Sequence, residues 1–369
     1  LTLHEVGHTL GLNHNFKASH LHDPVSVHDP LITQKSGVTA SVMEYPAVNI
    51  APLGVNQGDY YDVVTGAYDN WAIEFGYRPN LSEQERNQIL FRSDEPELIF
   101  GNDADDMRSP GRGIDPRAMT NDLTNDPITY AVQRIELVNQ TFKELPTKLE
   151  AKSWEEFVNA YQTLFRESGR SLQTVSRFVG GVYVNRSTPD QDSELRPFEP
   201  VSEEVQKRAM QVLNDHAFSP SAFPINEEIL TLIQKERRGF DFYSEHEDPQ
   251  VHRNILSIQT SVLAHLLNGW TLDRMTDSSL YGNTYSVNEM LLDLTNSIFI
   301  EDANSAVSKV RQNLQTLYVR RLIKLIDVEA SYQMTTAAAY SSLRSIEKIA
   351  FILLSVIVCM LLCWKACLK

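Results

Sequence analysis

The chain has 369 residues, enough for two or three domains, and its 42% hydrophobic and 22% charged residues are typical of a folded globular protein. A formal net charge of −15 argues against nucleic acid as a partner, because a phosphate backbone would be repelled. The acidic residues are scattered along the chain, which is typical of a solvated surface.

The first residues of the chain carry the pattern H-E-x-x-H-x-x-G-x-x-H. On a helix, His4 and His8 project from one face, one turn apart, so both imidazoles can bind one metal ion. Glu5 stands beside the first ligand, where it can act as a general base on a metal-activated water. A third ligand at His14 requires the helix to end, and Gly11 tolerates the left-handed backbone of such an ending. Three histidines leave one coordination position open, which predicts a catalytic Zn²⁺ site; the alternative is an amphipathic helix with surface histidines.

A second landmark is the stretch SVMEYP at residues 41–46. It resembles the Met-turn of the metzincin metalloproteases, in which a methionine lies beneath the zinc-binding histidines. The unbranched thioether of Met43 suits an irregular gap of this kind. In some metzincins, a tyrosine two residues after the methionine is a displaceable zinc ligand that stabilises the oxyanion. The resemblance implies that role for Tyr45, and the alternative is an aromatic side chain packed on the turn.

The resemblance extends over HNFKAS at 14–19, NIAP at 49–52, QGDYYD at 57–62 and YDNWAIEFGY at 68–77. Together these segments resemble the zinc-dependent metalloproteases that carry the EcxA-type zinc-binding domain. The resemblance implies a zinc metalloendopeptidase that hydrolyses a peptide or protein substrate with a zinc-activated water. It also implies a helix behind the active site, and residues 59–75 fit that helix because their apolar side chains recur at three-and-four spacing.

Metzincins place a mixed sheet before the active-site helix, and its edge strand binds the substrate. Because the sequence begins within that helix, we expect a fragment that needs the upstream part of the polypeptide to complete its active site. Alone, the fragment is expected to be inactive. Two other functions stay open: a pseudoprotease that only binds a partner, and a membrane-linked binding or scaffold module.

The expected fold class is mainly α, and four regions are expected. Residues 1–79 form the C-terminal part of a metzincin protease domain, with the active-site helix, the Met-turn and the following helix. Residues 80–126 connect this part to a helical domain at 127–345, and a hydrophobic tail helix follows at 346–369. The connecting region contains an acidic loop at 101–106, whose carboxylates could bind calcium. Its spacing is not that of an EF-hand, which favours a solvated loop or one that flanks the active site.

Local signals predict the helices of the expected helical domain. Asp126-Pro127 is an N-cap followed by proline, and Ser153 and Ser286 open capping boxes. Further helices are expected after residue 202, near 227, from 249 and from about 305. Residues 180–184 form either a short hairpin or a break, and 197–200 are expected to be a linker.

The tail carries no charge from 349 to 364, and it contains all three cysteines of the chain. As a helix this stretch is about 24 Å long, against a hydrocarbon core of about 30 Å. It is therefore either a short membrane span or a buried closing helix, and its hydrophobicity on all sides favours the membrane. Lysines at the end would then be cytoplasmic, and we expect a secreted or extracellular protease anchored by this tail.

Overall fold

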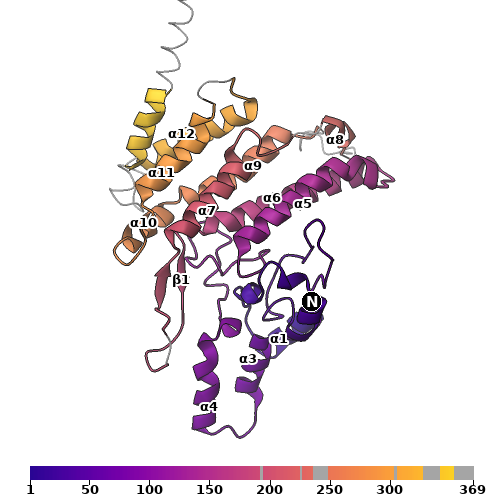
Figure 1. Ribbon diagram of the computed structural model, residues 1–369, viewed down its shortest axis with the longest axis vertical. Coiled ribbons are helices and arrows are strands. Elements are labelled where there is room, and N and C mark those ends of the chain that lie inside the picture. Colours follow the sequence, from indigo (N-terminus) through magenta and orange to yellow (C-terminus); the bar gives the residue numbers. More distant parts are fainter. Residues whose placement is uncertain (192–193, 225–226, 236–247, 303–305, 327–340, 353–369) are drawn as a thin grey trace, which may run out of the picture. The chain divides into compact units, whose positions relative to one another are not determined.

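The computed structural model describes residues 1–191, 194–224, 227–235, 248–302, 306–326 and 341–352 (Figure 1). These residues are mainly helical, as predicted, and the strands among them are two short ones. The chain divides into two compact units. Unit 1 contains Leu1–Leu137 and Gln173–Val201, and unit 2 contains Val138–Leu172 and Ser202–Lys369. Residues 80–126, expected to be a connecting region, belong to unit 1.

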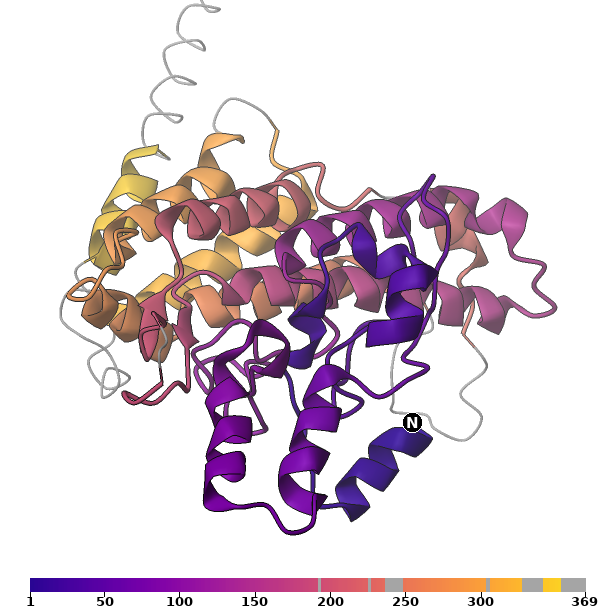
Figure 2. The ribbon, with the colours of Figure 1, turned by 60° about the horizontal axis from the view of Figure 1, so that its bottom comes forward.

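Unit 1 has short helices joined by long irregular segments. Figure 1 shows α3 and α4 side by side, and the two are in contact. In Figure 2, α1 lies beside α3, and a hydrogen bond of 2.9 Å from the Tyr77 hydroxyl to the Leu10 carbonyl joins the end of α3 to the end of α1. The helices that lie wholly in this unit are α1 (Thr2–Thr9), α2 (Pro30–Ser36), α3 (Ala67–Tyr77) and α4 (Glu83–Leu90), with 3₁₀ turns at Ala18–Leu21, Ser26–His28, Phe91–Asp94 and Pro96–Leu98.

Side chains satisfy the backbone of the irregular segments, where no helix or sheet ladder can do so. The Asp62 carboxylate accepts hydrogen bonds from the backbone N–H groups of Val38 and Thr39, at 2.7 and 3.0 Å. The amide of Asn49 donates to the carbonyls of Val27 and Asp59, both at 2.8 Å. These bonds surround a small buried cluster, which consists of Val27, Val38, Ala47, Leu123 and Tyr130.

The helix behind the active site is shorter than expected, because α3 begins at Ala67 and not near residue 59. Gly66 stops any extension toward the N-terminus, since its N–H donates to the Asp69 carboxylate at 2.9 Å and caps the helix there. A β-carbon on Gly66 would also overlap the carbonyl of Ala40, so this close approach needs glycine.

Two long helices, α5 (Pro127–Lys148) and α6 (Trp154–Arg177), each have residues assigned to both units. Both begin where the capping signals predicted: the Thr129 N–H donates to Asp126 at 3.1 Å, and α6 follows Ser153. Residues 180–184 contain strand β1 (Val182–Val184), which pairs with β2 (Phe198–Pro200) in a two-stranded antiparallel sheet. The prediction of a linker at 197–200 was therefore wrong. Pro200 is tolerated because it ends a strand that has only one neighbour.

Unit 2 is built from helices, and most begin near the predicted positions. Ser202 and Ser286 each accept a hydrogen bond from the backbone N–H three residues later. Helix α12 (Lys309–Ile326) begins near the predicted start. A short helix from Gly269, capped by Asn268, was not predicted. The helices that lie wholly in this unit are α7 (Glu203–Leu213), α8 (Glu227–Leu232), α9 (Val251–Leu266), α10 (Gly269–Ser278), α11 (Val287–Thr295) and α12 (Lys309–Ile326), with π-turns at Asn214–Phe218 and Asn296–Ile300.

A buried ion pair holds part of unit 2 together. Arg311 lies 2.5 Å from Asp302, and both side chains are almost fully buried. The guanidinium also donates to the carbonyls of Phe218, Ser297 and Ile298, so its N–H donors are largely satisfied. One buried apolar cluster of this unit consists of Leu145, Phe157, Val158, Tyr161, Ile229 and Ile233.

The expected tail helix falls mostly outside the described residues. Residues 341–352 are helical, whereas 353–369, with all three cysteines, are not described. In the part of the chain that is described, no helix combines the length and the apolar character needed to cross a bilayer.

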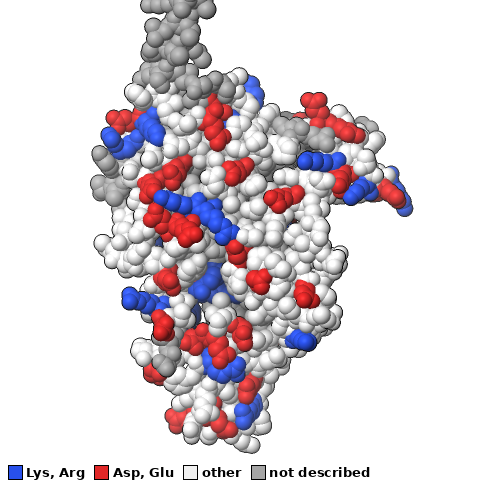
Figure 3. Space-filling view, viewed as in Figure 1, with Lys and Arg blue, Asp and Glu red and all other residues white. Residues whose placement is uncertain are grey.

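On the face shown in Figure 3, acidic and basic side chains are interspersed.

Candidate metal centre

The end of α1 has the geometry that the glycine at position 11 predicts. Gly11 has a φ of +85°, in the left-handed region. Its N–H donates to the His8 carbonyl, and the N–H of Leu12 donates to the Gly7 carbonyl, both at 3.0 Å. This pair of bonds is the Schellman motif, which ends a helix and reverses the chain. The turn allows His14 to return to the face of α1 that carries the first two histidines.

The three predicted histidines come together in the structure. The ring centroid of His4 lies 4.8 Å from that of His8 and 5.4 Å from that of His14, and the His8 and His14 centroids are 4.9 Å apart. One nitrogen from each ring can be chosen so that all three lie within 4.8 Å of one another. His4 is buried and His8 is exposed, so the cluster opens to solvent on one side. Glu5 follows His4 on the same helix and is exposed.

Hydrogen bonds to oxygen fix the tautomer of every ring in the cluster. Because each acceptor is a carbonyl or a carboxylate, the Nδ1 atom must carry the proton, and Nε2 keeps its lone pair. The pairs are His4 with the Val42 carbonyl at 2.8 Å, His8 with the Leu12 carbonyl at 3.0 Å, and His14 with the Asp103 carboxylate at 2.8 Å.

This donor set fits a zinc ion. Among the described residues, the Nε2 atom of His14 is buried without a hydrogen-bond partner, so a cation would satisfy it. Three neutral imidazoles, each oriented through its second nitrogen, are a common ligand set for catalytic zinc. His4, His8 and His14 are therefore the residues that would hold the ion.

Met43 lies under α1, fully buried. A β-carbon on Gly7 would overlap its sulfur, so the helix and the turn are in direct contact at this glycine. The Met43 carbonyl accepts a hydrogen bond of 3.1 Å from the N–H of Asn15, the residue after the third histidine. The methionine side chain thus contacts the helix of the first two histidines, and its backbone is bonded to the segment of the third.

Asp69, in the first turn of α3, fixes the Met-turn. Its carboxylate accepts hydrogen bonds from the Ser41 hydroxyl at 2.6 Å and from the Val42 N–H at 2.9 Å. The same carboxylate caps α3 through Gly66, so one side chain joins the helix to the turn. The Val42 carbonyl orients the His4 ring, so Asp69 acts on the metal centre indirectly, by holding Val42 in place.

Tyr45 reaches the histidine cluster from the far end of the Met-turn. Its hydroxyl lies 3.1 Å from Nε2 of His4, and its ring centroid is 4.8 Å from that of His4 and 4.9 Å from that of His14. The residue is 42% exposed. Its N–H is held by the buried carboxylate of Glu44 at 2.8 Å. Burial and the nearby charge of Asp122 raise the pKa of Glu44 well above its usual value.

Asp103 is the site residue that the sequence did not reveal. It stands in the acidic loop and is separated from His14 by 89 positions, so no local spacing connects the two. Partial burial acts to raise the pKa of its carboxyl, but the hydrogen bond from His14 outweighs that effect and the pKa is lowered.

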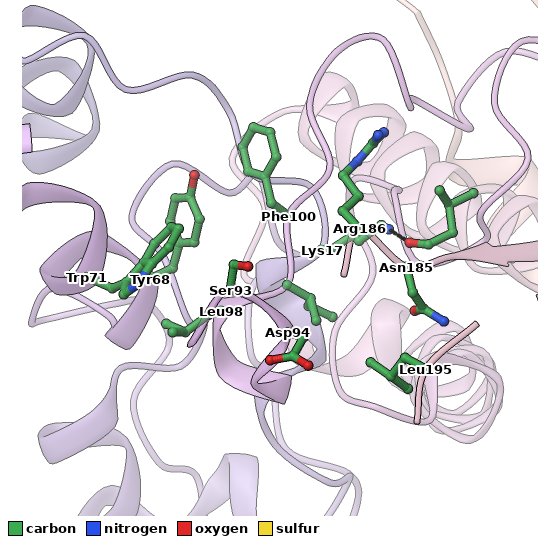
Figure 4. A pocket seen from close by; sticks show the side chains of 12 residues that line it. Lys17, Tyr68, Trp71, Ser93, Asp94, Leu98, Phe100, Asn185, Arg186 and Leu195 are labelled. Carbon is green, nitrogen blue, oxygen red and sulfur yellow. Dashed lines mark hydrogen bonds between the residues drawn. The ribbon is translucent and has the colours of Figure 1, made fainter. Parts of the chain in front are cut away.

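A cavity of about 210 Å³ in unit 1 lies away from this centre. Figure 4 shows the rings of Tyr68 and Trp71 on one side of it and Asn185 and Leu195 on the other. Its twelve lining residues, all in the described part of the chain, do not include the three histidines or Glu5. Lys17 also lines it, but the lysine Nζ is bonded to Asp115 at 2.7 Å and to the Val184 carbonyl at 2.8 Å. We therefore place the chemistry at the histidines and not in this cavity.

Two of the histidines lie on a helix that ends in a glycine turn, the third follows that turn, and a methionine is buried beneath the helix. This arrangement is typical of a metzincin-type metal centre. A family model described as Met-zincin matches residues 1–306, and the chain belongs to this family. Searches of curated proteins and of solved structures gave no match. Membership in the family indicates a zinc metalloprotease-like function.

Proposed function

We propose that the protein is a zinc-dependent metalloendopeptidase that hydrolyses peptide bonds in a peptide or protein substrate. The observation that carries the proposal is the set of three Nδ1 hydrogen bonds, which leaves three Nε2 lone pairs for one cation. Glu5 stands on the same helix, next to the first of these rings.

Glu5 and Tyr45 are the residues that would carry out the chemistry. Zinc held by the three histidines would supply Lewis acidity to the scissile carbonyl and lower the pKa of the attacking water. The Glu5 carboxylate accepts the proton of that water and passes it to the leaving amine. The Tyr45 hydroxyl donates a hydrogen bond to the oxygen of the scissile carbonyl as negative charge develops there.

The test is to replace Glu5 by glutamine in the full-length polypeptide, which includes the upstream part that is expected to complete the active site. The variant should keep one zinc ion per chain, because Glu5 is not a ligand. It should lose about 10²- to 10⁴-fold in hydrolysis of an unstructured protein substrate. Glu83→Gln, which changes an exposed carboxylate on α4, is the control and should hydrolyse the substrate like the wild type.

Two results would count against the proposal. Loss of zinc from Glu5→Gln would show that Glu5 is structural and not the base. Zinc binding by the wild type without any peptide hydrolysis would favour a pseudoprotease, the alternative that the sequence left open.

A further inference from the structure

The acidic loop at 101–106 meets the metal centre at one point. The Asp103 carboxylate accepts a hydrogen bond of 2.8 Å from Nδ1 of His14. His4 and His8 make the equivalent bond to backbone carbonyls, so His14 alone is oriented by a charged side chain. A carboxylate on the second nitrogen of an imidazole fixes the ring and makes it a more basic ligand.

The loop is anchored without the help of Asp103. The side chain of Asn15 donates to the Ile99 carbonyl at 3.0 Å and accepts from the Gly101 N–H at 3.2 Å. The N–H of Phe16 adds a bond of 2.7 Å to the Gly101 carbonyl. Removal of the Asp103 carboxylate therefore leaves the start of the loop attached to the segment that follows His14.

The other carboxylates of the loop are occupied by cations of the protein itself. Asp105 pairs with Arg186 at 2.6 Å, and Asp106 pairs with Arg108 at 2.9 Å. This pairing leaves the loop poorly suited to the calcium ion that its composition allows, because each arginine competes for the oxygens.

We propose that Asp103 is a positioning residue of the metal site, which holds the His14 ring with its Nε2 atom toward the ion and strengthens zinc binding. This inference rests on the proposed function only in that the three histidines bind zinc. The Asp103 side chain is 60% exposed, so water screens the interaction, and we expect an effect at the lower end of the usual range for such residues.

The experiment measures the zinc dissociation constant of the full chain by competition with a chromophoric chelator. Asp103→Ala removes both charge and acceptor and should weaken zinc binding about tenfold. Asp103→Asn keeps an oxygen acceptor without the charge and should fall between the alanine variant and the wild type. In the cobalt-loaded protein, the visible absorption bands of Asp103→Ala should shift, because a freed His14 ring changes the ligand field.

Asp105→Asn is the matched control, since it changes a carboxylate of the same loop that pairs with an arginine and not with a histidine. It should bind zinc like the wild type. Equal zinc affinity for Asp103→Ala and the wild type would overturn the inference, as would an equal loss in Asp105→Asn. A full-length wild type, upstream part included, that binds zinc but hydrolyses no peptide would refute the proposed function and leave the role of Asp103 intact.

Discussion

Met43 and Gly7 are packed so closely that residue 7 has no room for a β-carbon. The contact joins the helix that carries His4 and His8 to the turn beneath it. Because Met43 is fully buried, its side chain has little space into which it could retreat.

We expect Gly7→Ala to push α1 away from the turn. The free energy of unfolding should fall by about 1–3 kcal/mol, as is usual for overpacking, and zinc should bind more weakly. Urea denaturation and zinc competition measure the two effects. Adding Met43→Ala to Gly7→Ala frees the space, so the double variant should lose less than the sum of the two single losses; strictly additive losses would show that the two residues are not coupled.

The turn after α1 gives a second prediction. Gly11→Ala meets no atom within 4 Å, so its only penalty is the backbone strain of a φ of +85°, about 1–2 kcal/mol. Since this turn brings His14 to the cluster, zinc affinity should fall as well. Gly54→Ala is a close control, because Gly54 has a φ of +81° and equally open surroundings. It should lose similar stability and keep its zinc affinity; a similar loss of zinc from both variants would contradict the prediction.

Tyr45→Phe separates the two roles that the sequence left open for this tyrosine. Because its hydroxyl lies at the metal centre, we expect kcat to fall about 10- to 100-fold with little change in KM. Zinc content should stay at that of the wild type. An unchanged kcat in steady-state peptide hydrolysis would show that the ring serves only as packing.

A buried ion network predicts a pH-dependent contribution to stability. Burial acts to raise the pKa of Asp115, but hydrogen bonds from Arg117 and the charge of Lys17 outweigh it and lower the pKa to about 2. Burial lowers the pKa of Lys17, and Asp115 offsets part of that change. The Asp115 carboxylate thus has a lower pKa in the folded chain than its unfolded value of about 3.9. Its contribution is complete above about pH 4 and is lost as the pH falls through about 2.

Asp115→Asn should therefore lower the free energy of unfolding by about 3 kcal/mol at neutral pH, partly because Lys17 stays buried without its partner charge. The difference in the free energy of unfolding between variant and wild type should shrink as the pH falls from 4 to 2. Urea denaturation at each pH measures it. Glu83→Gln, at an exposed position, should follow the wild type throughout. A difference that grows toward acid pH would reverse the assigned sign.

The sequence predicted those parts of the site that depend on residues close together in the chain. The spacing of His4, His8 and Gly11 encodes a helix and its ending, and both are found. Met43 lies beneath the helix, as its resemblance to a Met-turn implied. Capping residues such as Ser153 and Ser286 likewise marked helix starts, because a cap acts within three residues.

Other features depend on contacts across the fold and were missed. Asp69 and Asp103 act on residues 27 and 89 positions away, and nothing in their immediate neighbourhood shows this. The start of α3 was misplaced because apolar spacing at 59–75 suits a helix, while the close approach of Gly66 to Ala40 that prevents it is tertiary. Strand β2 was taken for a linker because the prolines at 197 and 200 obscure a pairing that only β1 makes visible.

The three histidine rings differ in how far their orientation depends on the identity of other residues. A carbonyl oxygen is present whichever amino acid occupies positions 12 and 42, so the settings of His4 and His8 are insulated from most substitutions there. His14 depends on the identity of one residue, since only a side chain at 103 supplies its acceptor. Affinity for the metal can therefore be adjusted by single substitutions at position 103 without changing a ligand, which makes it the natural place to tune this site by design.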